Sequence, residues 1–292
     1  MKANNSYFPL RYTRRVKKRA TKYLFRVILG DDFLVILLAF NWAANQPLLH
    51  GIGLFFMLIS FWCIYEVGYL ENDLVGEKYE DNPVLSSTYK LYKQRGFSCQ
   101  PWLYSLLLAT IGIVIVEASQ NYGFYADSIG TNSFISLLRN NLSFWLIFLL
   151  CVRFLFRIYN YANKQTRVWF YLILQICRYF GFAIVIQTST IGTIFLIGNT
   201  ITRFIPYILY RYMGGKSGNW PKEFPTYFFR FIFYIFLLLG LVLCSPDLPL
   251  SLLVDKQTLF IALFCIVRGS LQIWRVLFQS KPVWKDSSNR AF

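Results

Sequence analysis

Charged residues are scarce in this sequence, and acidic residues are the scarcest of them. Charged residues make up 15% of the 292 positions, and 14 Asp and Glu stand against 30 Lys and Arg. Soluble domains carry about a quarter charged residues. With 56% hydrophobic residues, the chain is therefore expected to be an integral membrane protein. The net charge of +16 does not indicate a nucleic-acid partner, because the Lys and Arg lie mostly between apolar runs and at both ends.

Other absences exclude several classes of enzyme. His50 is the single histidine, which excludes a catalytic triad or zinc site that needs several histidines. The six cysteines form no Cys-x-x-Cys pair and lie mostly in apolar runs, so we interpret them as small buried apolar residues. The sequence has no P-loop, no Rossmann glycine pattern and no nucleophile elbow. We expect no cleavable signal peptide, because the basic start is long and the first apolar run ends in no clear cleavage site.

Apolar runs predict an all-α, polytopic membrane bundle of about eight spans. The expected spans are residues 32–48, 50–70, 101–117, 134–155, 168–187, 190–210, 226–244 and 250–267. Nearly all Lys and Arg lie at the two ends and in the connections after the second, fourth and sixth spans. By the positive-inside rule, both ends and these connections are expected in the cytoplasm. We therefore expect a basic arm (1–30), a transmembrane bundle (31–268) and a basic tail (269–292).

A strongly acidic stretch follows the second predicted span. Residues 65–83 hold six of the fourteen acidic residues in the chain. Asp73, Glu77 and Asp81 recur every four residues, so on a helix each is rotated by only about 40° from the one before. Three carboxylates on one helix face repel one another, and a divalent cation such as Mg²⁺ is a natural counter-charge. Pro83 is expected to end this helix.

The start of this stretch resembles a known motif. Asn72 and Asp73, with further acids after them, resemble the first aspartate-rich motif, N-D-x-x-D-x-x-x-D, of the UbiA superfamily of intramembrane prenyltransferases. The third position of the motif is Gly76, with an acid beside it. The last position is Glu80, again with an acid beside it. The resemblance implies a UbiA-like bundle in the inner (plasma) membrane of a bacterium.

Two more features are similar to this family, and one is missing. Tyr159 and Lys164 resemble its Tyr-x-x-x-x-Lys turn, and Arg178 near Gly181 resembles its intramembrane arginine with a nearby glycine. The second motif, D-x-x-x-D, is missing, because Glu223 is the single acid between positions 211 and 225. A phosphoribosyl-transferring branch of the family also lacks the ordinary second motif, so that branch stays open.

The resemblance implies roles for individual residues around a bound Mg²⁺ and a phosphorylated lipid. The implied catalytic residues are Asp73, Arg178 and Lys164. The implied metal ligands are Asn72, Asp73, Glu77, Glu80 and Asp81. The substrate-binding candidates are Asn41, Asn45, Tyr159, Lys216, Lys222 and Glu223.

Structural roles remain open for the same residues. The acids after Asp73 could pair with Lys78 and Lys90 instead of a metal ion. Asn41 and Asn45 could bridge helices rather than bind a head group. An arginine inside a membrane span usually faces the bundle interior with a partner, for which Glu66 or Asp73 is expected in the case of Arg178.

Three functions are consistent with these features. The first is a Mg²⁺-dependent UbiA-like transferase that moves a prenyl or phosphosugar group and uses a polyprenyl (di)phosphate lipid. The second is a relative that has lost the chemistry and binds an isoprenoid lipid as a scaffold or carrier for a protein partner. The third is a lipid transporter, which ranks last because no internal repeat or pair of broken helices is evident.

Overall fold

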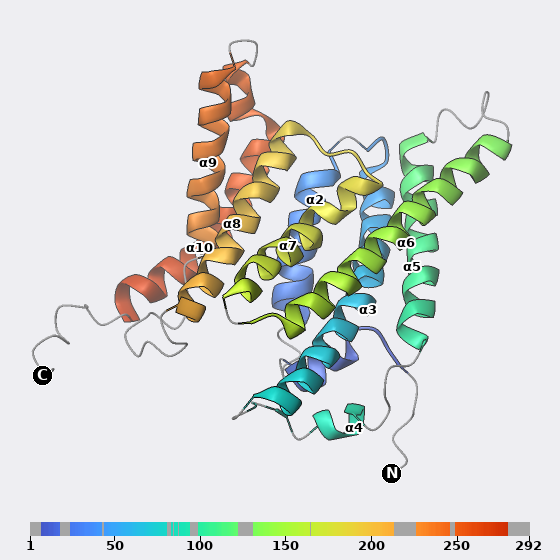
Figure 1. Ribbon diagram of the computed structural model, residues 1–292. Helices are drawn as coiled ribbons and strands as arrows, with labels where there is room; N and C mark the ends of the chain where they lie inside the picture. Colours follow the sequence, from blue (N-terminus) through green and yellow to red (C-terminus); the bar gives the residue numbers. More distant parts are fainter. Residues whose placement is uncertain are drawn as a thin grey trace, which may run out of the picture. The chain divides into compact units, whose positions relative to one another are not determined.

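The computed structural model describes residues 7–17, 24–42, 44–80, 83, 85–86, 88–93, 99–121, 131–163, 165–212, 226–245 and 249–279. Every regular element in these ranges is helical, as predicted (Figure 1). The long helices are α3 (Pro47–Tyr79), α5 (Gln100–Asn121), α6 (Thr131–Tyr161), α7 (Thr166–Phe180), α8 (Thr190–Tyr212), α9 (Thr226–Cys244) and α10 (Lys256–Gln279). The shorter elements are η1 (Thr13–Lys17), η2 (Leu24–Phe33), α2 (Leu34–Phe40), α4 (Tyr89–Lys93), η3 (Gly181–Ile184) and η4 (Leu250–Val254).

Within the described ranges, 7 helices are long and apolar enough to cross a membrane. They correspond to the second through eighth predicted spans, with η3 completing α7. The predicted first span, 32–48, differs, because its helix begins at Leu24 and ends at Phe40. Polar residues follow it, and Pro47 then begins α3 at a position where the missing proline N–H leaves no hydrogen bond unmade. At the other end of the chain, α10 runs past position 269, where the tail was expected to start.

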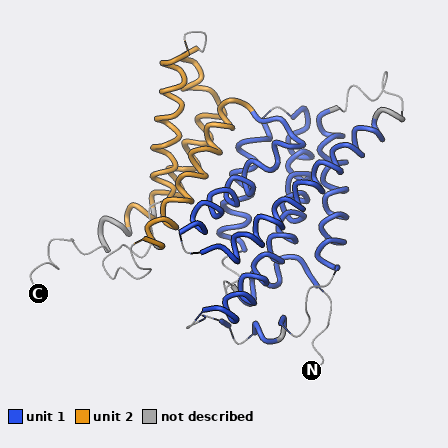
Figure 2. Tube along the Cα trace, in the orientation of Figure 1, with its two compact units in different colours: residues 1–188 blue, residues 189–292 orange. Residues whose placement is uncertain are grey.

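The chain divides into two compact units, residues 1–188 and 189–292 (Figure 2). The first unit contains the elements up to η3, and the second contains α8, α9, η4 and α10. This division was not expected from the sequence, in which positions 31–268 are predicted to form one bundle.

The central element of the first unit is α3, which packs against α2, η2, α5 and α6. Residues 60–68 are all buried, so this part of the helix has no face toward solvent or lipid. Gly53 and Gly112 let α3 and α5 approach closely, because a Cβ atom on either would lie 2.8 Å from the carbonyl oxygen of the other. The acidic stretch thus begins on a part of α3 that is buried on all sides.

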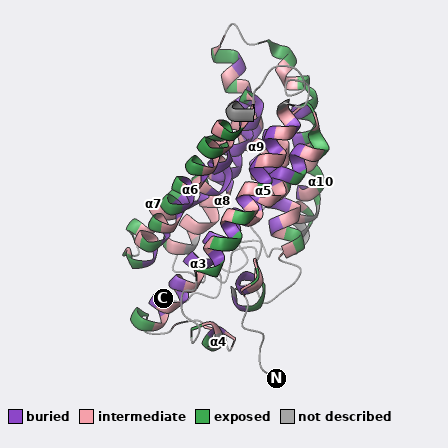
Figure 3. Cartoon of the chain, turned by 90° about the vertical axis from the view of Figure 1, so that its right-hand side faces the viewer, coloured by how far each residue is buried: buried purple, intermediate pink, exposed green. Residues whose placement is uncertain are grey.

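Outer helices expose apolar side chains along their length. Rows of exposed residues run along α6, α7 and α10 (Figure 3). On α6 they include Phe144, Ile147, Leu150 and Phe154. Large apolar side chains at this spacing on an outer helix face are expected of helices that contact lipid.

Candidate functional site

The C-terminal half of α3 carries a row of carboxylates that fasten other segments to this helix. Glu66 and Asp73 are seven residues apart, which places them on nearly the same helix face, and Glu77 follows one turn later. Glu66 is 2% exposed and Asp73 is 7% exposed. Asp73 and Glu77 were predicted to share one helix face. Both accept hydrogen bonds from residues that cover the same side of α3, which agrees with that prediction.

Glu66 holds the N-terminal segment 7–17. Its Oε1 accepts a hydrogen bond from the Thr13 backbone N–H at 2.7 Å. Its Oε2 accepts one from the Leu10 N–H at 2.9 Å and another from the Tyr7 hydroxyl at 3.1 Å. A buried carboxylate with three donors is well satisfied, so Glu66 works as an anchor for this segment.

Two tyrosines bind the next two carboxylates. The Tyr12 hydroxyl donates to Asp73 Oδ2, and the Tyr89 hydroxyl donates to Glu77 Oε2 at 2.8 Å. Burial raises the pKa of both tyrosines, and their hydrogen bonds to these carboxylates raise it further, so both stay protonated donors. The two rings belong to one small apolar cluster with Val16, against which side chains of α3 pack.

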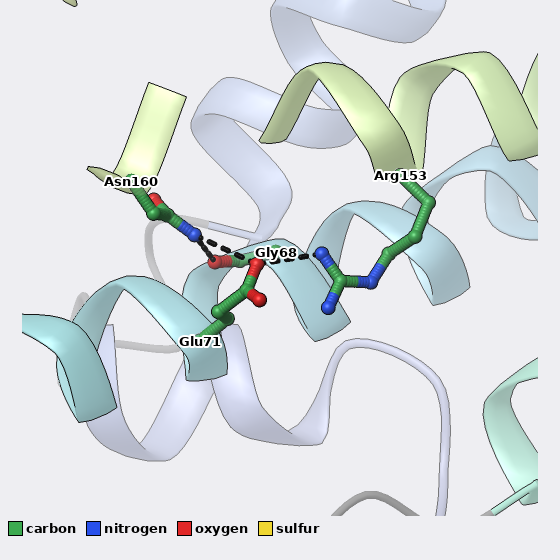
Figure 4. Close-up of polar contacts among 4 residues, drawn as sticks. All are labelled: Gly68, Glu71, Arg153 and Asn160. Atoms are coloured by element: carbon green, nitrogen blue, oxygen red, sulfur yellow. Dashed lines mark hydrogen bonds and ion pairs between the residues drawn. The ribbon is translucent and has the colours of Figure 1, made fainter. Parts of the chain in front are cut away.

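Glu71 faces the other way, toward α6 (Figure 4). Its Oε2 accepts a hydrogen bond from Arg153 Nη1 at 2.6 Å and from Asn160 Nδ2 at 3.1 Å. The Asn160 amide also donates to the Gly68 carbonyl at 3.3 Å. This network ties the end of α6 to α3 and neutralises the Glu71 charge.

A pocket of 480 Å³ opens beside these carboxylates. Its walls are Glu71, Leu74, Val75, Glu77, Lys78, Tyr79, Lys93 and Tyr161. Both acids are matched by a cation, since Lys93 Nζ lies 2.9 Å from Glu77 and Arg153 binds Glu71. Lys78 is exposed and adds a positive charge that these two pairs do not balance. The pocket therefore favours a ligand with a negative group and some apolar surface.

Arg178 is buried, as predicted, but its partner differs from the prediction. It forms an ion pair with Asp32 of η2, not with Glu66 or Asp73. The Tyr179 hydroxyl donates to the other Asp32 oxygen at 3.0 Å. The Arg178 guanidinium lies 4.9 Å from the Trp62 ring centroid. Arg178 thus joins η2, α3 and α7 within an apolar region. Its predicted catalytic role stays a prediction.

The Tyr159 end of α6 is bound by Arg167, the second residue of α7. Arg167 Nε donates to the Tyr159 carbonyl at 3.0 Å, and its guanidinium lies 5.1 Å from the Tyr159 ring centroid. Arg167 also reaches Glu80, with the charged atoms 3.9 Å apart. Lys164, Lys216, Lys222, Glu223 and Asp81 lie outside the described residues, so their predicted roles stay predictions.

Asn41 and Asn45 do not share a site with Asp73. They precede α3, whereas Asp73 lies 26 residues after Pro47, about 39 Å along the helix at 1.5 Å per residue. Asn45 Nδ2 donates to the Gln120 carbonyl at 2.6 Å, and Asn41 Oδ1 lies 3.0 Å from His50 Nδ1. These contacts are of the helix-bridging kind, and the predicted substrate-binding role of the two asparagines stays a prediction.

The predicted Mg²⁺ ligands do not converge in the arrangement that the structure describes. No group of three or more His, Cys, Asp and Glu side chains comes together among the described residues. Asp73 and Glu77 are bound by tyrosines, and Asn72 points about 100° away from Asp73 around the helix. The helix ends at Tyr79, so Glu80 has extended backbone and is exposed. These residues as placed do not fit a metal shell.

Sequence reasoning missed several residues that organise this region. Asp32, Glu71, Arg153 and Asn160 were not proposed as candidates. The available signal was the rarity of charge inside apolar runs, because Asp32 and Arg153 both lie in stretches predicted to enter the membrane.

Comparisons of the chain with protein families, with characterised proteins and with solved structures found no match.

Proposed function

We propose that this protein is an integral membrane protein that binds a phosphorylated lipid, with the head group in the pocket at the end of α3. The observation that carries the proposal is the charge of that pocket. Glu77 is paired with the wall residue Lys93, and Glu71 is paired with Arg153, which lies outside the walls, so neither acid engages the exposed wall cation Lys78. Ammonium groups bind phosphate oxygens well as point charges.

The remaining walls suit the first part of a lipid tail. Leu74 and Val75 supply apolar surface, and Tyr79 and Tyr161 pack their rings 6.4 Å apart beside them. Aromatic side chains of this kind are frequent at the membrane–water interface. An isoprenoid tail is the choice that the UbiA resemblance supports, and the positive-inside pattern supports a cytoplasmic location for the pocket and both chain ends.

Binding is favoured over chemistry by the way the acids are used. Asp73, Glu77 and Glu66 each fasten a neighbouring segment, and Glu71 is neutralised by Arg153. Carboxylates that are engaged in such structural contacts are expected in a UbiA-like protein that has lost the chemistry and binds lipid as a scaffold or carrier.

Lipid extracted from the purified protein tests the proposal. Mass spectrometry of the wild-type extract is expected to find a phosphorylated isoprenoid enriched over the surrounding membrane. Lys78→Glu reverses the excess charge and is expected to lower that enrichment about tenfold or more, the loss of one charge-assisted contact. Lys90→Glu is the matched control, because Lys90 is exposed and does not line the pocket. Ordinary phospholipid alone, or equal loss in both variants, contradicts the proposal.

A second candidate is a Mg²⁺-dependent UbiA-like transferase of prenyl or phosphosugar groups. It is favoured by the Asn72-Asp73 pair and by the placement of Asp73 and Glu77 on one covered face of α3. The residues as placed do not fit a metal ion, so this function requires Tyr12 to leave Asp73.

Activity assays separate the two candidates. A transferase is expected to turn over a polyprenyl diphosphate with Mg²⁺ and to lose that turnover in Asp73→Ala at unchanged expression. A carrier is expected to bind the lipid with or without Mg²⁺ and to show no turnover. Full activity of Asp73→Ala would exclude a catalytic role for the aspartate-rich motif at Asn72 and Asp73.

A further inference from the structure

Lys93 is the residue that α4 contributes to the wall of the pocket, and one carboxylate of α3 binds it there. The two helices are in contact (Figure 1). Lys93 Nζ lies 2.9 Å from Glu77 Oε2, and the Tyr89 hydroxyl donates to the same oxygen at 2.8 Å. Because Lys93 follows Tyr89 by four residues, both side chains leave the same face of α4. Two donors from α4 therefore share one oxygen of Glu77.

These two donors differ in how firmly the fold holds them. Tyr89 is 1% exposed and lies in the apolar cluster that Tyr12 also joins. The Lys93 side chain is 51% exposed, and the Glu77 side chain is 32% exposed. An ion pair with this much contact with water contributes little to stability. Lys93 can therefore leave Glu77 at small cost, while Tyr89 keeps both α4 and the carboxylate in place.

A second ammonium group reaches the same pocket from α3. Lys78 lies two turns after Glu71 on nearly the same helix face, and both residues line the pocket. Glu71 is bound by Arg153 at 2.6 Å, so it does not engage Lys78. Lys78 Nζ lies 5.0 Å from the Tyr79 ring centroid, which keeps the ammonium group beside another wall residue. Lys78 and Lys93 thus approach one pocket from two different helices.

A phosphate group is a stronger partner for the Lys93 ammonium group than Glu77 is. The Glu77 oxygen that Lys93 contacts also accepts the Tyr89 hydroxyl, so it is shared between two donors. A phosphate group that Lys78 binds through one oxygen still has another charged oxygen for a second lysine. Both lysines line a pocket of 480 Å³, and the lysine side chain is long and flexible.

We propose that Lys93 is a second head-group contact of the pocket and that Glu77 competes with the ligand for it. When the ligand binds, Lys93 exchanges the Glu77 carboxylate for a phosphate oxygen, and Lys78 binds another oxygen of the same group. Glu77 keeps the hydrogen bond from Tyr89. This inference rests on the proposed function, because it assigns how the same pocket recognises its phosphorylated lipid.

The exchange also determines which head groups the pocket accepts. A neutral hydroxyl carries no charge with which to displace a carboxylate from an ammonium group. A zwitterionic head group brings a cation of its own, which the two lysines repel. The ligand class is therefore a phosphate ester without a cationic substituent.

Calorimetric titration of the full chain in lipid nanodiscs tests the exchange, with geranylgeranyl monophosphate as the probe. The uncharged reference is geranylgeraniol, and the zwitterionic reference is the phosphocholine ester of the same alcohol. The wild-type protein is expected to bind the monophosphate about tenfold or more tightly than either reference. A phosphocholine ester that binds as tightly as the monophosphate overturns the exchange.

Two substitutions with opposite expected signs distinguish the exchange from a merely structural ion pair. Lys93→Gln is expected to raise the Kd of the monophosphate about tenfold, and Lys93→Arg is expected to retain most of the affinity. Glu77→Gln is expected to lower that Kd about two- to fivefold, because it removes the competing charge and its amide oxygen still accepts the Tyr89 hydroxyl. Lys90→Gln is the matched control on α4, since Lys90 is exposed and does not line the pocket.

The outcomes separate this inference from the proposed function. If Lys78→Glu weakens binding but Lys93→Gln does not, the pocket keeps its ligand and the exchange is wrong. Weaker binding in both Lys93→Gln and Glu77→Gln indicates an ion pair that only supports α4, and it overturns the exchange as well. Tighter binding in Lys93→Gln means that a ligand cation replaces Lys93 on Glu77, which also overturns it. A wild-type protein that does not prefer the monophosphate to geranylgeraniol contradicts both proposals.

Discussion

At the scale of single residues, the ion pair between Arg178 and Asp32 is the contact whose loss is expected to cost the most. Both side chains are buried, and Asp32 is 0% exposed. Asp32→Asn leaves a buried guanidinium without its carboxylate, which is expected to cost about 3–5 kcal/mol. The measurement is thermal unfolding in detergent. Adding Arg178→Gln to Asp32→Asn is expected to recover part of the loss, because it removes the uncompensated charge.

Glu80→Gln is the control for that prediction. Glu80 is exposed, and its charge lies 3.9 Å from Arg167, so its removal is expected to change stability by less than about 1 kcal/mol. Equal effects of Asp32→Asn and Glu80→Gln would contradict the account of the buried pair.

The burial of Arg178 was predictable from sequence, whereas its partner was not. An arginine near the middle of an apolar run has to face the protein interior, which needs no knowledge of the fold. Its partner depends on how η2 packs against α7, and Asp32 and Arg178 are 146 positions apart in the sequence. The acids on α3 were the more prominent candidates in the sequence, but they are bound by the N-terminal segment, α4 and α6.

At the scale of elements, the N-terminal segment 7–17 depends on one carboxylate of α3. Glu66→Gln replaces an acceptor with an amide donor that faces backbone N–H groups, so this segment is expected to open more often. Trypsin is expected to cleave after Arg11, Arg14 or Arg15 about tenfold faster or more, in line with the loss of a charge-assisted contact. Glu117→Gln, the same change at a carboxylate bound by Asn141, is expected to leave these cleavage rates unchanged.

The packing of α3 against α6 depends on Gly68. A Cβ atom there would lie 2.3 Å from the Phe156 ring, so Gly68→Ala is expected to force the helices apart and cost about 1–3 kcal/mol. Gly240→Ala is the matched control. A Cβ on Gly240 would meet no atom within 4 Å, and alanine is expected to stabilise α9 by about 0.5–1 kcal/mol. Thermal unfolding measures both, and a neutral Gly68→Ala would contradict the close packing.

Sequence patterns located the elements well and their contacts poorly. The apolar runs predicted seven of the long helices, because the length and polarity of a membrane span are local properties. The bounds 32–48 were misjudged, since the helix begins at Leu24 and ends at Phe40, before the mixed polar and apolar residues 41–46. The common face of Asp73 and Glu77 followed from helical periodicity, but Tyr12, which binds Asp73, comes from a segment 61 positions away.

At the scale of the whole molecule, the distribution of Lys and Arg predicts how the chain crosses the membrane. Two exposed cysteines test it, Cys99 before α5 and Cys244 at the end of α9. In spheroplasts, a membrane-impermeant maleimide is expected to label Cys244 and to spare Cys99. Both are expected to react once the membrane is permeabilised, which serves as the control, and labelling of Cys99 in intact spheroplasts contradicts the proposed orientation.

The central claim is that the pocket at the end of α3 holds a phosphorylated lipid, and photo-crosslinking tests it most directly. A phosphorylated isoprenoid with a photoreactive group near its head is irradiated with the protein in nanodiscs, and the labelled peptides are sequenced. The account predicts labels at the pocket walls, such as Leu74, Tyr79 and Tyr161, that disappear with excess unlabelled phosphorylated isoprenoid and fall in Lys78→Glu but not in Lys90→Glu. Labels spread over the lipid-facing helices and unaffected by that competitor would contradict it.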